Sequence, residues 1–234
     1  MVFNMQNKLW PLPGCLRQLI LVTFMLFLIS CANAGTINKS QIRGTLLTEG
    51  AEIPSVTLSN QHNELLSPIN FEGQVIILTF LYTSCTNVCP VVANQIKYVY
   101  QALANESDLE VVIISVDPSG DNVESTKEFL DRFNMNDNWS YLTGDERDLR
   151  QMWDAYYVDP VTSIKKDSKH QATSTTKKHT SAKQGLIQES LEIIHSTPIY
   201  LIDKKGIAKI LYTTPFEVED MIHDVEYLIN QKNR

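Results

Sequence analysis

The sequence of 234 residues predicts an α/β domain in which helices flank a mixed sheet, with an N-terminal hairpin extension. Three observations carry this prediction. Two short, almost wholly apolar runs each precede an amphipathic helical pattern, as in parallel strands joined by crossover helices. Two further apolar runs, on either side of residues 203–206, are typical of an antiparallel hairpin. The content of 43% hydrophobic and 20% charged residues is that of an ordinary globular protein.

The first 34 residues have the features of an export signal. Lys8 and Arg17 make a basic region, and the apolar run Leu19–Ile29 is short for a membrane span. Cleavage before Cys31 would give a lipoprotein acylated on that cysteine, cleavage after Ala34 would give ordinary secretion, and a retained signal anchor is the third reading. Each reading places the folded part on the periplasmic side of a bacterial cell envelope, where we expect it to be membrane-anchored through the lipid or the signal.

The remaining chain has the length of one domain. We expect a polar tether over residues 35–50 and the folded domain over residues 51–234. Within that domain, residues 165–184 are rich in Lys, Ser and Thr and nearly lack apolar residues, which predicts a flexible insertion. We interpret it as a solvated loop. The alternatives are a docking arm for an acidic partner and an auxiliary metal site through His170 and His179.

The predicted elements follow from the hydrophobic pattern, in chain order. Weak alternation predicts a hairpin over residues 53–58 and 64–66. The run VIILTFLY at 75–82 predicts a buried strand, and apolar residues on one face predict a helix over 91–104. The run VVIISV at 111–116 predicts a second buried strand.

The second half of the chain continues with two helices, a hairpin and a last helix. Asn122 precedes the first of these helices as a possible cap. The predicted ranges are helices at 123–133 and 146–157, strands at 199–202 and 207–212, and a helix at 216–229. This order combines parallel and antiparallel strands in one sheet.

The main chemical signal is a pair of cysteines. Outside the targeting segment the chain has only Cys85 and Cys89, in the run TSCTNVCP between a strand and a helix. A disulfide closing so short a loop would stabilise the fold little, so the pair is better explained by chemistry. A helix N-terminus stabilises the thiolate, which is the reactive and metal-binding form. Such a pair can close a disulfide reversibly or hold a soft cation such as Cu(I).

Two sulfurs leave a bound ion with few ligands, and an imidazole is the natural third. His195 directly precedes the C-terminal hairpin, whose first strand we expect beside the cysteine loop. Its position alone is equally compatible with a histidine held by loop hydrogen bonds. We interpret His62 as solvated and His223 as structural, and Asp117 as the residue that forms a turn before the following proline.

These motifs together resemble the Sco/SenC family of copper proteins, a branch of the thioredoxin-like fold. The motifs are FLYTSCTNVCP at 80–90, ISVDP at 114–118, LTG at 142–144 and HSTPIYLIDKKG at 195–206. The resemblance covers about residues 53–230 apart from the insertion, and it matches Cys85, Cys89 and His195 to the family's copper ligands. It implies delivery of copper to cytochrome c oxidase, with that enzyme's copper-bearing subunit or another copper protein as the partner.

Two positions depart from the family pattern. Ile194 stands where the family often has an acidic residue before the histidine, which removes a hydrogen-bond partner of the ring. Pro198 is unusual at its place, and a cis bond between Thr197 and Pro198 would favour redox chemistry.

We therefore expect a copper metallochaperone that binds Cu(I) or Cu(II) through Cys85, Cys89 and His195 without turnover. The alternative is a thiol–disulfide oxidoreductase in which Cys85 and Cys89 are the catalytic residues. A peroxidase is a weaker third option, because no proton-handling constellation surrounds a single cysteine. The net charge of −7, without a large basic patch, argues against nucleic acid as a partner.

Overall fold

The computed structural model describes residues 41–103, 107–165 and 190–231. The expected targeting segment at 1–34, most of the expected insertion at 165–184, His170 and His179 lie outside these ranges. The chain divides into two compact units, and the larger one, Ile42–Asn233, contains the fold. No helix within the described ranges has the length and apolarity needed to cross a bilayer.

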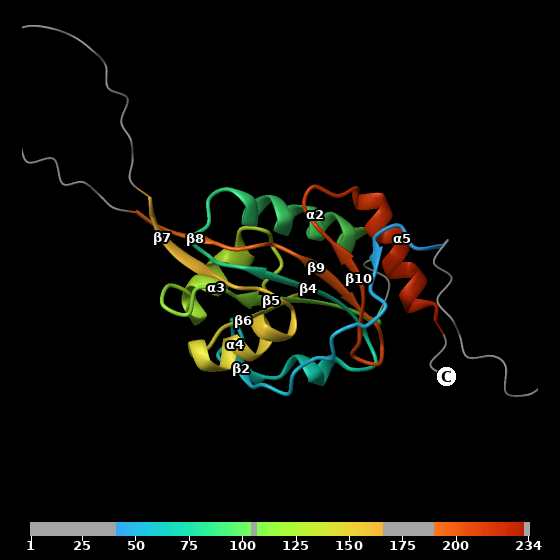
Figure 1. The fold of residues 1–234 in the computed structure, drawn as a ribbon, viewed down its shortest axis with the longest axis horizontal. Helices are drawn as coiled ribbons and strands as arrows, with labels where there is room; N and C mark the ends of the chain where they lie inside the picture. Colours follow the sequence, from blue (N-terminus) through green and yellow to red (C-terminus); the bar gives the residue numbers. More distant parts are fainter. Residues whose placement is uncertain (1–40, 104–106, 166–189, 232–234) are drawn as a thin grey trace, which may run out of the picture. The chain divides into compact units, whose positions relative to one another are not determined.

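A six-stranded mixed sheet forms the centre of the domain (Figure 1). Its strands are β1 (Thr45–Leu46), β4 (Val75–Leu81), β5 (Leu109–Ser115), β6 (Ser140–Leu142), β9 (Ile199–Ile202) and β10 (Ala208–Tyr212). They lie in the order β1-β10-β9-β4-β5-β6. The strands β4, β5 and β6 are parallel, whereas β9, β10 and β1 join antiparallel. Every residue of β4 is buried, as its uninterrupted apolar run predicts.

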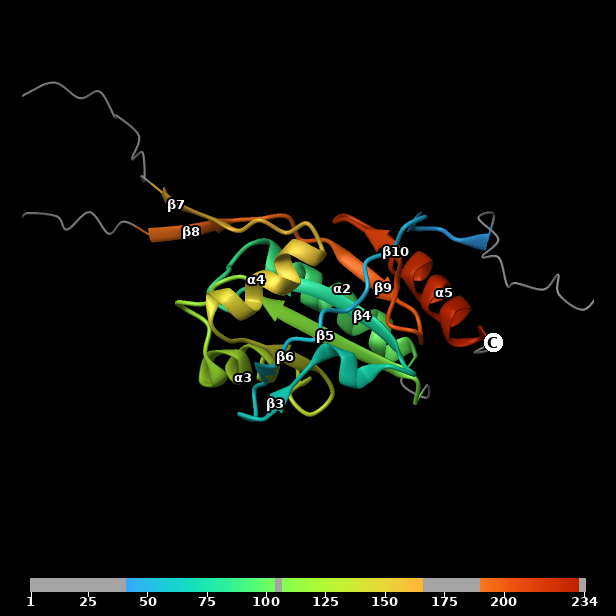
Figure 2. The same cartoon turned by 60° about the horizontal axis from the view of Figure 1, so that its bottom comes forward.

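Among the described residues, two helices cover each face of this sheet. The helices are α2 (Val88–Ala102), α3 (Val123–Asp131), α4 (Glu146–Ala155) and α5 (Val218–Ile229). Figures 1 and 2 place α2 beside α5 on one face and α3 and α4 on the other. The Asn122 side chain accepts hydrogen bonds from the backbone N–H groups of Glu124 and Ser125, both at 3.0 Å, and so caps α3 as expected. This architecture confirms the predicted fold class.

Two small sheets accompany the main one. The strands β2 (Leu58–Ser59) and β3 (Leu65–Leu66) pair as the predicted N-terminal hairpin, and a short 3-10 helix (Pro68–Phe71) follows them. The strands β7 (Val161–Lys165) and β8 (Ser190–Ile194) form a ribbon that extends away from the main sheet (Figure 2). The sequence pattern did not predict this ribbon, which brings together the two chain ends that flank the expected insertion.

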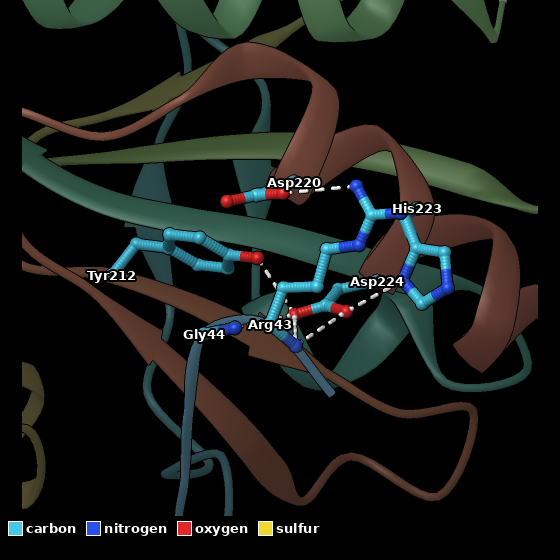
Figure 3. A network of polar contacts seen from close by, with 6 residues as sticks. All are labelled: Arg43, Gly44, Tyr212, Asp220, His223 and Asp224. Atoms are coloured by element: carbon cyan, nitrogen blue, oxygen red, sulfur yellow. Dashed lines mark hydrogen bonds and ion pairs between the residues drawn. The ribbon is translucent and has the colours of Figure 1, made fainter. Parts of the chain in front are cut away.

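A buried carboxylate fastens the first described residues to the body (Figure 3). Asp224 of α5 has no exposed surface, and it accepts hydrogen bonds from the backbone N–H groups of Arg43, at 3.1 Å, and Gly44, at 2.8 Å. The Tyr212 hydroxyl donates to the same carboxylate at 2.6 Å, and the His223 ring donates at 3.0 Å. Arg43 and Gly44, within the stretch 35–50 that composition alone marks as a tether, are therefore held by the folded domain.

Candidate metal centre

The two cysteines lie side by side where β4 passes into α2. Cys85 is in the connecting loop and is 5% exposed, whereas Cys89 is in the first turn of α2 and is fully buried. The backbone N–H of Cys89 donates a hydrogen bond to the Cys85 sulfur at 3.4 Å. Both are free thiols. The four-residue spacing thus brings the two sulfurs together at the helix N-terminus, as the sequence predicts.

Their surroundings give the two thiols opposite tendencies to ionise. Hydrogen bonds to the Cys85 sulfur lower the pKa of Cys85 to about 5, against the opposing effect of burial. The largest contribution comes from the Cys89 thiol, and smaller ones come from the backbone N–H groups of Cys89 and Asn87 and from Tyr82. The neighbouring Cys85 sulfur, and then burial, raise the pKa of Cys89 far above its ordinary value. Cys85 is therefore the thiolate of the pair, and Cys89 stays protonated until it binds a cation or is oxidised.

His195 follows β8 directly, at the base of the ribbon. Its Nδ1 lies 2.6 Å from the carbonyl oxygen of Ser196, and because a carbonyl only accepts, Nδ1 carries the hydrogen. The other ring nitrogen, Nε2, is buried and has no hydrogen-bond partner among the described residues. The ring packs edge-on against Tyr82, with 5.6 Å between ring centroids. Burial lowers the pKa of His195, so the neutral ring presents an unused lone pair on Nε2.

The three expected ligands are neighbours, but their side chains do not surround a common position where a metal ion could bind. The Cys85 thiolate is close enough to His195 for its charge to raise the pKa of the ring, against the larger effect of burial. Within the described ranges, no group of three or more His, Cys, Asp or Glu side chains is arranged to hold a metal ion. The structure thus unites Cys85 with Cys89 and leaves His195 beside them.

The donor set and the orphaned nitrogen fit a soft metal. Two sulfurs and one imidazole are ligands that suit copper. A buried ring nitrogen without a partner is unfavourable unless some ligand occupies it.

Sequence reasoning missed a second buried carboxylate below the cysteine loop. Asp121 is 6% exposed and accepts hydrogen bonds from the backbone N–H of Thr83, at 2.9 Å, and from its hydroxyl, at 2.7 Å. Asp117, four residues earlier, accepts from the backbone N–H of Gly120 and forms the turn, as expected. The repeat of aspartate after the turn in DPSGD was the available signal, but it is also the composition of an ordinary loop.

The other features singled out in the sequence lie outside the centre. His62 is exposed, and its Nε2 donates to the carbonyl oxygen of Asn136 at 3.1 Å. His223 pairs with Asp224, in agreement with a structural role. The cis peptide bonds among the described residues comprise Thr214–Pro215 alone, so the bond before Pro198 is trans. The condition that would have favoured redox chemistry at Pro198 is therefore not met.

Comparisons with known proteins agree on the family. A family model described as SCO1/SenC matches residues 48–230. The SCO1 protein homolog of Bacillus subtilis (strain 168) is 30% identical over 122 residues, which are 51% of this chain and 60% of that protein. The alignment thus spans less than two thirds of the curated relative.

Solved structures share the fold. Arabidopsis thaliana ScoI with copper bound has a TM-score of 0.62 at 21% identity, covering 78% of this chain and all of that one. BsSco, described as a member of the Sco family of cytochrome c oxidase assembly proteins with a disulfide switch, has a TM-score of 0.56 at 22% identity, covering 81% and 98%. Because the matched family model spans most of the chain and takes in strands β4 to β10, the cysteine loop and His195, this chain belongs to the SCO1/SenC family.

Proposed function

We propose that this chain is a copper-binding metallochaperone of the Sco/SenC type. The observation that carries the proposal is the pair of adjoining buried sulfurs, Cys85 and Cys89, beside His195, whose Nε2 is buried and without a partner. Copper bound in the related ScoI structure supports the choice of metal. Copper is the cargo, held by two thiolates in the Cu(I) form and by the thiolates with the imidazole in the Cu(II) form.

The partner and the location follow from the family and from the N-terminal sequence. BsSco belongs to a family of cytochrome c oxidase assembly proteins, which supports delivery to, or maintenance of, the copper site of that enzyme. The recipient is then the copper-bearing oxidase subunit or another copper protein. We place the domain on the periplasmic side of a bacterial envelope, anchored through an acylated Cys31 or a retained signal.

Anaerobic titration of the purified protein with Cu(I) and with Cu(II) tests the proposal. We expect one copper per chain, with sulfur-to-copper charge-transfer absorption in the Cu(II) form. Cys85→Ala and Cys89→Ala each abolish binding, and His195→Ala removes the Cu(II) absorption while Cu(I) still binds the two sulfurs more weakly. His223→Ala is the matched control and leaves both titrations unchanged. Wild-type stoichiometry in both cysteine variants would exclude the copper site.

A second candidate function is thiol–disulfide exchange, which the paired free thiols and the lowered pKa of Cys85 favour. In that reaction the Cys85 thiolate attacks a partner disulfide and releases a partner thiolate, and Cys89 then resolves the mixed disulfide. The chain loses two electrons and the proton of Cys89, and the partner gains one thiol and one thiolate, which takes a proton from solvent. Reduction of a peptide disulfide that requires Cys85 but survives His195→Ala would support exchange, and no exchange with the wild-type chain would eliminate it.

A further inference from the structure

Asp121 joins the cysteine loop to two neighbouring strands. Its Oδ1 accepts both hydrogen bonds from Thr83, which is two residues before Cys85. Its Oδ2 accepts from the Ser115 hydroxyl at 2.7 Å and from the Tyr141 hydroxyl at 3.1 Å. One carboxylate therefore connects the loop that leaves β4 with the end of β5 and the middle of β6.

The loop is held at Thr83 from both sides. Asp121 fixes the amide and the hydroxyl of Thr83, while the guanidinium of Arg132 donates to the Thr83 carbonyl at 3.3 Å. The next polar contact along the loop is the Cys85 backbone N–H, which donates to the Tyr82 carbonyl at 3.3 Å. Thr83 is thus a fixed point from which the chain turns to place Cys85 against Cys89.

Burial of a carboxylate in this place is costly, and its four donors offset that cost. Burial raises the pKa of Asp121, and the hydrogen bonds from Thr83 and Ser115 oppose that rise. Two of the four donors come from the cysteine loop itself. An apolar residue at position 121 could not make these hydrogen bonds, whereas the carboxylate fixes the position of the loop relative to the sheet.

We propose that Asp121 is a positioning residue that acts through Thr83 to hold Cys85 over Cys89, and so favours formation of the disulfide between them. Disulfide geometry is narrow, so a loop that holds the two sulfurs together raises their effective concentration for each other. The inference rests on the proposed function only in taking this thiol pair as the working centre. It concerns the metal-free protein.

Equilibration with glutathione redox buffers tests it on the full chain. Glutathione disulfide takes two electrons from the Cys85 thiolate and the Cys89 thiol together with the proton of Cys89, which gives the protein disulfide, one glutathione thiol and one glutathione thiolate that takes a proton from solvent. Asp121→Asn keeps the shape of the side chain but weakens the anchor, and we expect the equilibrium constant for disulfide formation to fall about tenfold, or ~30 mV in potential. Thr83→Val removes one hydroxyl donor without a change of charge and lowers the constant several-fold.

The two substitutions should not add. If Asp121 acts through Thr83, the double variant is little different from Asp121→Asn alone. Asp224→Asn is the matched control, because Asp224 is also buried and also accepts backbone N–H groups and a tyrosine hydroxyl, but none of these donors belongs to the cysteine loop. Its potential should equal that of the wild type.

Two results would overturn the inference: a wild-type potential in Thr83→Val, or an equal shift in Asp224→Asn. Thr83→Val carries the test alone if Asp121→Asn does not fold. Since glutathione reports on the thiols without metal, a chain that fails to bind copper still yields this measurement, and the two proposals stand or fall separately.

Discussion

His195 shows how a single residue can keep its chemistry when a neighbour changes. The family often has an acidic residue before this histidine, and Ile194 cannot accept a hydrogen bond. In the structure the Ser196 carbonyl is the acceptor instead: it accepts a hydrogen bond from Nδ1 of His195 and leaves Nε2 without a partner. A neutral carbonyl fixes the tautomer as a carboxylate would, but it adds less negative charge beside the ring. The sequence could not reveal this substitute, because the acceptor is a backbone atom.

The pKa of Cys85 gives a prediction at the same scale. Since that pKa is lowered to about 5, the reduced protein should react with iodoacetamide at Cys85 with a rate that rises through pH 5 and is level above pH 6. Mass spectrometry of the labelled chain over pH 4–9 measures this. In Cys89→Ala the donor to the Cys85 sulfur is removed, so the midpoint should move to higher pH. A midpoint near that of an ordinary thiol in the wild type would contradict the arrangement of the pair.

At the scale of elements, long periodic patterns were predictable and short pairings were not. The predicted strand at 75–82 corresponds to β4 and the predicted helix at 146–157 to α4, because burial of a whole run or face dictates those patterns. The three-residue β6 is too short to show a period, and β1 has two residues. The β7–β8 ribbon was not predicted because its strands flank a stretch that nearly lacks apolar residues. These elements exist through pairing with distant partners, which local sequence does not record.

The strand β5 contains a half-buried carboxyl group, that of Glu110, which makes stability depend on pH. Burial raises the pKa of Glu110 to about 7, although the Ser140 hydroxyl donates to it at 3.1 Å. Below pH 4.5, the ordinary pKa of the group, Glu110 is protonated in both the folded and the unfolded chain and costs the fold no stability. As the pH rises from 4.5 to 7 the unfolded chain loses this proton first, so the free energy of unfolding falls. Glu110→Gln should therefore be about 2 kcal/mol more stable than the wild type at pH 8, and the difference should vanish below pH 4.5.

Urea unfolding at pH 8 and at pH 4.5 measures the effect of Glu110→Gln. Glu128→Gln, on an exposed position of α3, is the control and should change the free energy of unfolding little at either pH. A Glu110→Gln variant that is no more stable than the wild type at pH 8 would show that this carboxyl group is solvated in the folded chain.

At the scale of the whole molecule, the fold contains two separate carboxylate anchors. Asp121 joins the cysteine loop to β5 and β6, and Asp224 joins the N-terminal segment to β10 and α5. The first anchor bears on the metal centre and the second on the point at which the expected membrane tether reaches the body. Neither was predictable from the sequence, because each aspartate accepts hydrogen bonds from a segment distant in sequence, Thr83 for Asp121 and Arg43 for Asp224. Changes at the second anchor should affect stability without changing the thiol pair.

Gly44 provides the sharpest test of the second anchor. A Cβ atom on Gly44 would lie 2.6 Å from Ile210 and 2.7 Å from the ring of Tyr212, so Gly44→Ala must displace the tyrosine that donates to Asp224. We expect a loss of about 1–3 kcal/mol in the free energy of unfolding, as for other overpacked sites.

Tyr212→Phe removes only the hydroxyl and should lower the free energy of unfolding by about 1–2 kcal/mol. Both variants should keep the wild-type thiol potential and copper stoichiometry, because none of the donors to Asp224 belongs to the cysteine loop. Urea unfolding beside a glutathione titration measures both quantities, and an unchanged stability in Gly44→Ala would show that the N-terminal segment is not held by Asp224.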